Sequence, residues 1–409
     1  MKVWLLTDGE PLFFEQGQRC HRTGSLARQL AKAGHETVWW TSRMDHTSKV
    51  YNEHYNDIHN VSKNLKTFFL KSSGYKKNMS LSRILHARSI SSEFFKRSNV
   101  EIKPDIIVAA MPSPEFCLAG YKYAKLNNVP FVIDIRDPWP DIFSGYFSPR
   151  IKFIIYPLIY YYRQMIRKIA KGASGIMAVS QSQLDWGLLY AQREFNNNRD
   201  KLLYIGHENN NRSRSIKKIK KFSSKEPMKC MYITSWGSSY DAETLIKTAK
   251  ILDKKVGQKI KIIATGSGDK KLSKIKGYKK LKNIIFTGFI SSKKMDEYLN
   301  NAHIGLILMK GGITRYWIGN KIGEYISASL AIINNVETEV AQVIEANCVG
   351  LNVPSNNPEA TANALIKCLI SPEKTSSFMN NSNNLFDTSF NRVENTKNYI
   401  AHLEKLCKN

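Results

Sequence analysis

Short apolar runs alternate with amphipathic segments along the first half of the chain. The runs lie within "KVWLLT", "HETVWWTS", "PDIIVAAM", "PFVIDIRD" and "ASGIMAVS". Between the first two, "RTGSLARQLAKAG" places Leu26, Leu30 and Ala31 at helical spacing and ends at Gly34, which favours a helix. Strands that are apolar throughout are buried on both faces. The pattern therefore predicts a parallel sheet with helices on both sides.

A polar, basic segment, "GHENNNRSRSIKKIKKFSSKEP", interrupts this alternation, which restarts at "KCMYITS" and continues through "IKIIATG", "NIIFTGF" and "HIGLILM". The pattern predicts two doubly wound α/β domains, 1–205 and 228–385, joined by a basic linker or loop over 206–227. We expect a C-terminal helix over 386–409 that can pack back on the first domain. Ligands of such sheets bind beyond the carboxyl ends of the strands, and two facing domains would form a cleft.

Length and charge narrow the functional classes. A chain of 409 residues suits two domains of about 200 residues each. A net charge of +27 implies an anionic partner: phosphates, nucleic acid or an acidic membrane surface. We do not expect nucleic acid, because no helix-turn-helix, zinc-finger or RNA-binding motif is evident and the cations are spread along the chain. The N-terminus does not read as a signal peptide, and no apolar run is long enough to span a bilayer.

The most informative stretch is "RYWIGNKIGEYISASLAIINN", from Arg315 to Asn335. If its centre is a helix, the amides at the start form an anion site, to which Arg315 and Lys321 add positive charge. Glu324 cannot bind phosphate, but its carboxylate can accept hydrogen bonds from a ribose hydroxyl pair. These groups suit a nucleoside diphosphate. The alternative is that Glu324 caps its own helix, a common role for acids in the first turn.

A longer segment, "NKIGEYISASLAIINNVETEVAQVIEANCVGLNVPSNNPEATANAL", resembles the donor-binding region of glycosyltransferase family 4. Similar pieces follow in the family's order: "SLARQLAKAGHETVWWTS", "VIDIRDPWPD", "YITSWGSSYDAETLIKTAKIL" and "IIATGSGD" with "NIIFTGFIS". The resemblance implies the GT-B fold: two Rossmann-like domains facing a central cleft, an acceptor domain over 1–205 and a donor domain over 228–385. It also implies that Glu324 binds the nucleotide ribose.

Two departures from the family pattern concern the donor site. Tyr316 stands where the family has a first glutamate, and the loop "TSWGSSYDAE" lacks the usual Arg and Lys. Arg315 and Lys321 are candidates to supply that charge, although most cations of these types are ordinary surface residues. The resemblance also indicates a base contact near Ile290. The full set of expected donor-binding residues is Glu324, Lys321, Asn320, Arg315, Gly17, Ser235 and Ile290.

The stretch "DIRDPWPD" follows an apolar strand of the first domain and therefore lies at the expected cleft. We take Asp137 and Arg136 as the catalytic candidates, because an acid here could accept the proton of the acceptor hydroxyl. The alternative is a strand-end turn held by aspartate side chains. The candidate acceptor and cleft residues are Gln18, Arg19, His21 and Trp139.

The segment "SPRIKFIIYPLIYYYRQMIRKIAKGA" combines an apolar stripe with basic residues. From Pro157, a plausible first helical residue, the stripe consists of Leu158, Ile159, Tyr162, Met165, Ile166 and Ile169. This helix either faces the core of the first domain or rests on an anionic membrane; both can hold for different faces.

The resemblance implies a retaining glycosyltransferase that uses a nucleotide sugar and a glycan or polyprenyl-diphosphate-linked acceptor for a surface polysaccharide such as O-antigen or capsule. We expect no cofactor and no metal, since the sequence has no Asp-x-Asp pair, and a cytoplasmic location, peripheral on the inner face of the cell membrane. A nucleotide-sugar epimerase of the same fold and a non-catalytic partner subunit are the alternatives. Donor base, sugar and acceptor leave no readable pattern in the sequence.

Overall fold

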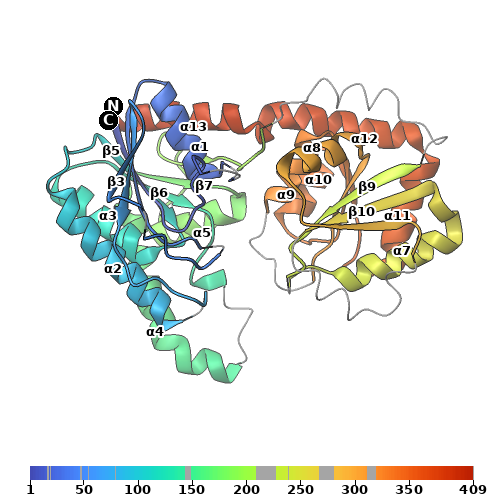
Figure 1. The fold of residues 1–409 in the computed structure, drawn as a ribbon, viewed down its shortest axis with the longest axis horizontal. Coiled ribbons are helices and arrows are strands. Elements are labelled where there is room, and N and C mark those ends of the chain that lie inside the picture. Colours follow the sequence, from blue (N-terminus) through green and yellow to red (C-terminus); the bar gives the residue numbers. More distant parts are fainter. Residues whose placement is uncertain are drawn as a thin grey trace. The chain divides into compact units, whose positions relative to one another are not determined.

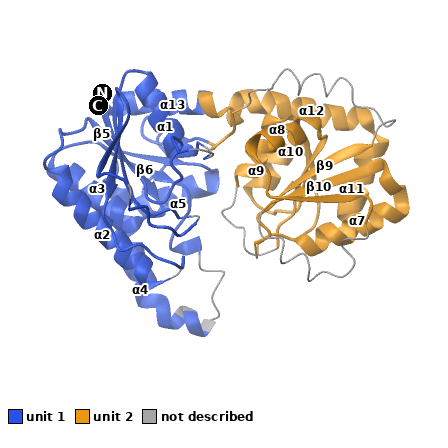
Figure 2. Cartoon of the chain, in the orientation of Figure 1, with its two compact units in different colours: residues 1–203, 394–409 blue, residues 204–393 orange. Residues whose placement is uncertain are grey.

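A computed structural model describes residues 1–15, 18, 20–46, 48–53, 55–78, 80–142, 149–208, 227–237, 239–266, 281–310 and 319–408. The chain forms two compact units (Figure 2). Unit 1 contains residues 1–203 and 394–409, and unit 2 contains residues 204–393. Of the predicted linker, residues 209–226 lie outside the described part of the chain.

Unit 1 is built on an eight-stranded sheet with the order β3-β4-β2-β1-β5-β6-β7-β8. The strands are β1 Lys2–Leu6, β2 Glu36–Ser42, β3 Ile58–Ser62, β4 Leu65–Leu70, β5 Ile106–Met111, β6 Phe131–Ile135, β7 Gly175–Ala178 and β8 Lys201–Leu202. Every neighbouring pair is parallel except β3 with β4. The five strands expected from apolar runs are confirmed as β1, β2, β5, β6 and β7.

Helices cover this sheet (Figure 1). They are α1 Arg22–Lys32, α2 Leu81–Ser98, α3 Pro114–Leu126, α4 Pro149–Gly172, α5 Gln181–Ala191 and the C-terminal α13 Arg392–Lys408. Tyr399, Leu403 and Leu406 of α13 share a buried cluster with Val3 and Leu26. The C-terminal helix is therefore part of the core of unit 1, and the two chain ends lie side by side.

Unit 2 has a six-stranded, fully parallel sheet with the order β11-β10-β9-β12-β13-β14. The strands are β9 Met228–Ile233, β10 Ile260–Thr265, β11 Ile284–Gly288, β12 Ile304–Ile307, β13 Ala331–Asn334 and β14 Gly350–Asn352. The helices are α7 Ala242–Val256, α8 Ser292–Asn301, α9 Asn320–Ser327, α10 Glu339–Ala346, α11 Pro358–Ile370 and α12 Pro372–Leu385, followed by a π-helical turn at Phe386–Phe390. Separate apolar clusters bury the two sheet faces. The predicted doubly wound α/β class is confirmed for both units.

Helix α4 differs from its prediction at one end. It begins at Pro149 and contains Pro157 in its interior, instead of beginning there. A proline inside a helix removes one backbone hydrogen bond and usually kinks the helix, but the helix can continue beyond it. Two faces result. Tyr162, Met165, Ile166 and Ile169 are buried against unit 1, whereas the earlier turns are largely exposed.

Candidate active site

Helix α9, the centre of the informative stretch, is held in place by Tyr325. This side chain is fully buried, and its hydroxyl accepts a hydrogen bond from the amide of Ile233 at 3.0 Å. The same hydroxyl lies 3.2 Å from the carbonyl oxygen of Met231 and 3.1 Å from that of Leu306. Gly305 makes room for the ring, because a Cβ there would lie 2.4 Å from it. The packing fixes α9 relative to the carboxyl ends of β9 and β12.

Glu324 lies in the second turn of α9. The helix begins at Asn320 after Gly319, and its first turn contains no acid. The alternative that Glu324 caps the helix is therefore wrong, because capping carboxylates act within the first turn. The residue is 9% exposed, and its backbone oxygen accepts a hydrogen bond from the Ser327 hydroxyl at 2.8 Å. Its role toward a ribose stays a prediction.

Lys321, in the first turn of α9, contacts the loop that follows β9. Its ammonium group lies 4.4 Å from the centre of the Tyr240 ring and donates a hydrogen bond to the Tyr240 hydroxyl. That loop is in turn bound to the segment after β12, since Asp241 donates its amide to Leu308 at 3.2 Å. A cation and a helix start thus meet beyond the carboxyl ends of two central strands, the usual place for a ligand in this class of sheet.

Ser235 and Ile290 lie on neighbouring loops at the same edge of the unit 2 sheet. Ser235, exposed, follows β9, and half-buried Ile290 follows β11. Gly266, after β10, passes so close to Thr234 that a Cβ would lie 1.5 Å from the Thr234 carbonyl oxygen. These loops bring four of the donor candidates, Glu324, Lys321, Ser235 and Ile290, to one edge of the sheet, with Asn320 exposed at the start of α9. Arg315, Tyr316 and Gly17 lie outside the described residues.

In unit 1, Arg136 belongs to a buried ion network at the end of β6. Asp134 is fully buried and accepts hydrogen bonds from the Nε atoms of Arg136 and Arg22, each at 3.0 Å. Burial disfavours the Asp134 carboxylate, but the two guanidinium groups outweigh it and lower the pKa of Asp134 below its ordinary value. Buried charges of this kind are stable only when paired.

The same network reaches the start of α1 through Glu10. The Glu10 carboxylate accepts the amides of Thr23 at 3.2 Å and Gly24 at 2.9 Å, and it accepts a bond from Nη1 of Arg136 at 2.6 Å. Arg136 also donates to the Thr23 hydroxyl at 2.7 Å. Burial would lower the pKa of Arg136, yet the carboxylates of Asp134 and Glu10 raise it. Arg136 therefore ties the ends of two strands to α1, and a direct part in the reaction stays a prediction.

Asp137 follows this network and differs from Asp134 in its surroundings. More than a third of the residue is exposed. The protein packed around its carboxyl nevertheless raises the pKa to about 6, against the opposing charges of Arg136 and Arg83. An acid with such a pKa is largely ionised near neutral pH and can accept a proton.

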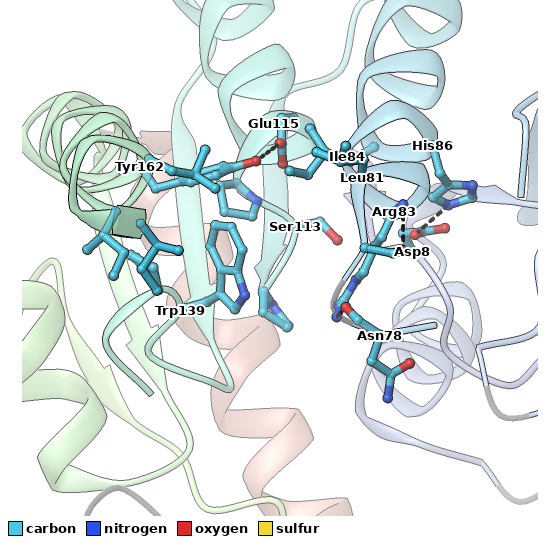
Figure 3. Close-up of a pocket in the computed structure, with 18 residues that line it drawn as sticks. Asp8, Asn78, Leu81, Arg83, Ile84, His86, Ser113, Glu115, Trp139 and Tyr162 are labelled. Carbon is cyan, nitrogen blue, oxygen red and sulfur yellow. Dashed lines mark hydrogen bonds and ion pairs between the residues drawn. The ribbon is translucent and has the colours of Figure 1, made fainter. Parts of the chain in front are cut away.

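The acceptor candidates are spread over unit 1. Trp139 is half-buried and packs edge-to-face against Tyr162, with ring centres 4.2 Å apart. Gln18 is exposed, and His21 is the N-cap residue of α1. Arg19 lies outside the described residues. Among the described members of this set, Trp139 lines a cavity between α2, α4 and the start of α3 (Figure 3).

Sequence reasoning missed a second polar group beside this cavity. Asp8, after β1, lies 2.9 Å from Nε2 of His86 on α2 and accepts the Ser42 hydroxyl at 2.5 Å. Burial opposes ionisation of Asp8, but the bonds from His86 and Ser42 outweigh it and lower the pKa of Asp8. These residues are far apart in the chain and match no local motif. The described residues contain no group of three or more His, Cys, Asp and Glu side chains arranged to hold a metal ion.

Comparisons with known proteins cover both units. The family model described as "Glycosyltransferase Family 4" matches residues 22–190, and the model described as "Glycosyl transferases group 1" matches residues 230–371. No curated protein matches the chain significantly.

Solved structures share the fold over nearly the whole chain. Sucrose-phosphate synthase from Thermosynechococcus elongatus superposes with a TM-score of 0.70 at 14% identity, covering 99% of this chain and 98% of that one. HepE of Anabaena, in complex with UDP and glucose, gives 0.65 at 13% identity, with 99% of each chain covered. WaaG, a glycosyltransferase involved in lipopolysaccharide biosynthesis, gives 0.58 at 12% identity, covering 97% and 98%. The predicted two-domain fold is therefore confirmed.

Proposed function

The chain belongs to glycosyltransferase family 4 and is a glycosyltransferase of the GT-B fold, and from this premise we propose that it transfers a sugar, with retention, from a nucleoside diphosphate to a hydroxyl of a lipid-linked surface glycan. One observation carries the donor half of the proposal: Lys321 and Glu324 lie on one helix, at the strand ends of the unit matched by the group 1 model. HepE and its bound UDP and glucose support a nucleotide-sugar donor.

The amides at the start of α9 and the Lys321 ammonium group would bind the diphosphate, while Glu324 binds the ribose. The leaving diphosphate gains negative charge as the glycosidic bond breaks. Groups that are already oriented toward this charge stabilise the transition state more than the bound substrate, so they raise turnover. The contact with Tyr240 supports this role, because it holds the Lys321 side chain in one orientation before the donor arrives.

Replacing Lys321 with alanine should lower kcat about 100-fold and change the donor KM less, since the lost charge acts mainly on the leaving group. Steady-state kinetics with a saturating acceptor measures this split. Lys254→Ala is the matched control, because Lys254 is an exposed lysine in the last turn of α7. A donor KM that rises as steeply as kcat falls would place Lys321 in ground-state binding instead.

Asp137 is the proposed proton acceptor for the acceptor hydroxyl. With a pKa near 6, it is protonated and inactive at lower pH, so the rate of transfer should rise with pH through about 6 and then level off. Asp137→Asn should remove this limb and lower kcat by about 100-fold or more, with unchanged donor affinity. If the Asp137→Asn variant keeps the wild-type rate and pH profile, Asp137 has no part in proton transfer.

The first turns of α4 provide a surface for an acceptor at a membrane. Phe153 is 84% and Ile154 is 75% exposed, and Tyr156 and Arg150 are exposed beside them. Aromatic and apolar side chains with nearby cations are typical of helices that rest on anionic bilayers, where each basic residue contributes about 1 kcal/mol. No helix among the described residues is long and apolar enough to cross a bilayer. The role of WaaG in lipopolysaccharide biosynthesis supports a surface-glycan acceptor.

The double variant Phe153→Asp, Ile154→Asp should lose binding to vesicles that contain phosphatidylglycerol, because it places two carboxylates on the apolar surface. Co-sedimentation with vesicles measures the loss. Leu126→Asp is the control, since Leu126 on α3 is 78% exposed and lies on another helix. Equal sedimentation of all three proteins would contradict the membrane assignment of α4.

A thermal-shift screen with UDP-, GDP- and ADP-sugars tests the proposed function as a whole. One base should raise the melting temperature, because a ligand at 100 times its Kd stabilises the native state by ~2.7 kcal/mol. Conversion of the donor into its epimer without any acceptor would instead identify an epimerase. Absence of binding by every nucleotide sugar would point to a non-catalytic partner subunit.

A further inference from the structure

A cavity of about 250 Å³ lies in unit 1 between α2 and α4, beside the start of α3 (Figure 3). Six apolar side chains from the two long helices line it: Leu81, Ile84, Ala87, Ile155, Leu158 and Ile159. Trp139 and Tyr162 close one side, and Arg83 lies across from them. The residues come from segments that follow three neighbouring strands, β1, β5 and β6, and from the helices next to them.

The acids that line this cavity are already engaged with protein partners. Glu115 accepts a hydrogen bond from the Tyr162 hydroxyl, and burial raises the pKa of its carboxyl. Asp8 is bound to His86. A sugar placed among the apolar side chains would lose its hydrogen bonds to water, and each hydroxyl left without a new partner would weaken binding. Hydrocarbon has no such cost and gains from leaving water.

The size of the cavity suits part of a ligand rather than a whole one. Sites for complete small molecules usually measure about 300–1,000 Å³, so 250 Å³ accommodates a segment of a chain. Its rim includes Leu81, which lines the cavity and is also 77% exposed. Leu158 likewise lines the cavity and is exposed, one turn after Ile154. The cavity therefore opens toward the apolar surface of α4, from which a lipid chain could enter.

Arg83 gives the cavity one cationic end. Its guanidinium donates to the backbone oxygen of Asn78 at 2.9 Å and lies 5.7 Å from the centre of the Tyr75 ring, which orients it. Its charge also acts on Asp137, the proposed proton acceptor. An anionic group at the end of a chain bound among the apolar residues would therefore meet the Arg83 guanidinium group.

We propose that this cavity binds a hydrocarbon segment of the lipid-linked acceptor and that Arg83 binds the adjoining phosphate. The inference rests on the proposed function for its acceptor class, and it adds the site and the part of the acceptor that the site recognises. The occupant is an amphiphile with one linear or isoprenoid chain and an anionic phosphate or diphosphate. We choose this type of ligand because the cavity has an apolar interior next to an oriented guanidinium group.

Titration calorimetry with farnesyl diphosphate, farnesol and inorganic diphosphate tests the inference on the full-length protein. Farnesyl diphosphate should bind at least tenfold more tightly than either of the other two, because only it occupies both halves of the site. Leu81→Glu should weaken its binding at least tenfold. Leu85→Glu is the matched control: Leu85 is 57% exposed on the same helix and does not line the cavity, so its affinity should equal that of the wild type.

The outcomes separate this inference from the proposed function. Equal affinity for farnesyl diphosphate and inorganic diphosphate, or equal losses in Leu81→Glu and Leu85→Glu, would overturn the cavity assignment even when a nucleotide sugar binds. Arg83→Ala should remove the preference for farnesyl diphosphate over farnesol; a preference that persists would overturn the phosphate contact. Failure of every nucleotide sugar to bind would refute the donor proposal while leaving the farnesyl diphosphate result intact.

Discussion

Replacing Glu324 with alanine should raise the donor KM on the order of 100-fold. Glu324 is 9% exposed at the strand ends of unit 2, so hydrogen bonds to its carboxylate form in a poorly hydrated place. A hydrogen bond to a charged group contributes about 1.5–3 kcal/mol, and a loss of ~3 kcal/mol corresponds to roughly 100-fold in affinity. Steady-state kinetics over a range of donor concentrations measures the change.

Two comparisons make this result specific. Glu345→Ala removes an exposed acid from α10 and should leave the donor KM unchanged. Melting temperatures of both variants separate lost binding from lost folding, because Glu324 is buried and its removal can leave a gap in α9. A folded Glu324→Ala protein with the wild-type KM and turnover would refute the ribose assignment.

Replacing Asp134 with alanine should destabilise unit 1 by about 3–5 kcal/mol. The carboxylate is fully buried between Arg22 and Arg136, and its removal leaves two guanidinium groups in a poorly hydrated place without their common partner. Asp137→Ala is the matched control, three residues along the chain and exposed, and it should shift stability far less. Chemical denaturation followed by circular dichroism measures both changes in the free energy of unfolding.

The pH dependence of this difference follows from the lowered pKa of Asp134. Its stabilising contribution is complete above the unfolded pKa of about 3.8 and is lost as the pH falls through the still lower folded pKa. The gap in unfolding free energy between wild type and Asp134→Ala should therefore stay constant from neutral pH to about pH 5 and narrow below pH 4. A gap that widens on acidification would contradict the ion-pair account.

The sequence predicted most of the sheet architecture because parallel strands buried on both faces are continuously apolar. β5 and β12 are clear examples of such runs. The hairpin of β3 and β4 was missed, since "IHNVS" is largely exposed and polar and so carries no apolar pattern. The start of α4 was misplaced because Pro157 matched the preference of proline for a first helical turn, while exposed apolar turns before it gave no helical stripe.

In the candidate site too, the sequence predicted some features and missed others. Lys321 and Glu324 could be singled out because a local pattern and a family resemblance both include them. Their surroundings could not be predicted, because the contacts join distant segments: Lys321 meets Tyr240, 81 residues earlier, and Tyr325 bonds to Ile233, 92 residues earlier. Arg136 was a catalytic candidate, but nothing in "DIRDPWPD" indicated that Asp134, Glu10 and Thr23 engage its guanidinium group.

The claim that Glu324 binds the ribose hydroxyl pair is tested most directly by titration calorimetry with paired nucleotides. The pair is the nucleoside diphosphate selected in the thermal screen and its 2′,3′-dideoxy analogue, each titrated into wild type and Glu324→Ala. Wild type should bind the ribonucleotide on the order of 100-fold more tightly than the dideoxy form, and the variant should bind both equally weakly. A variant that still distinguishes the two nucleotides as the wild type does would contradict the account.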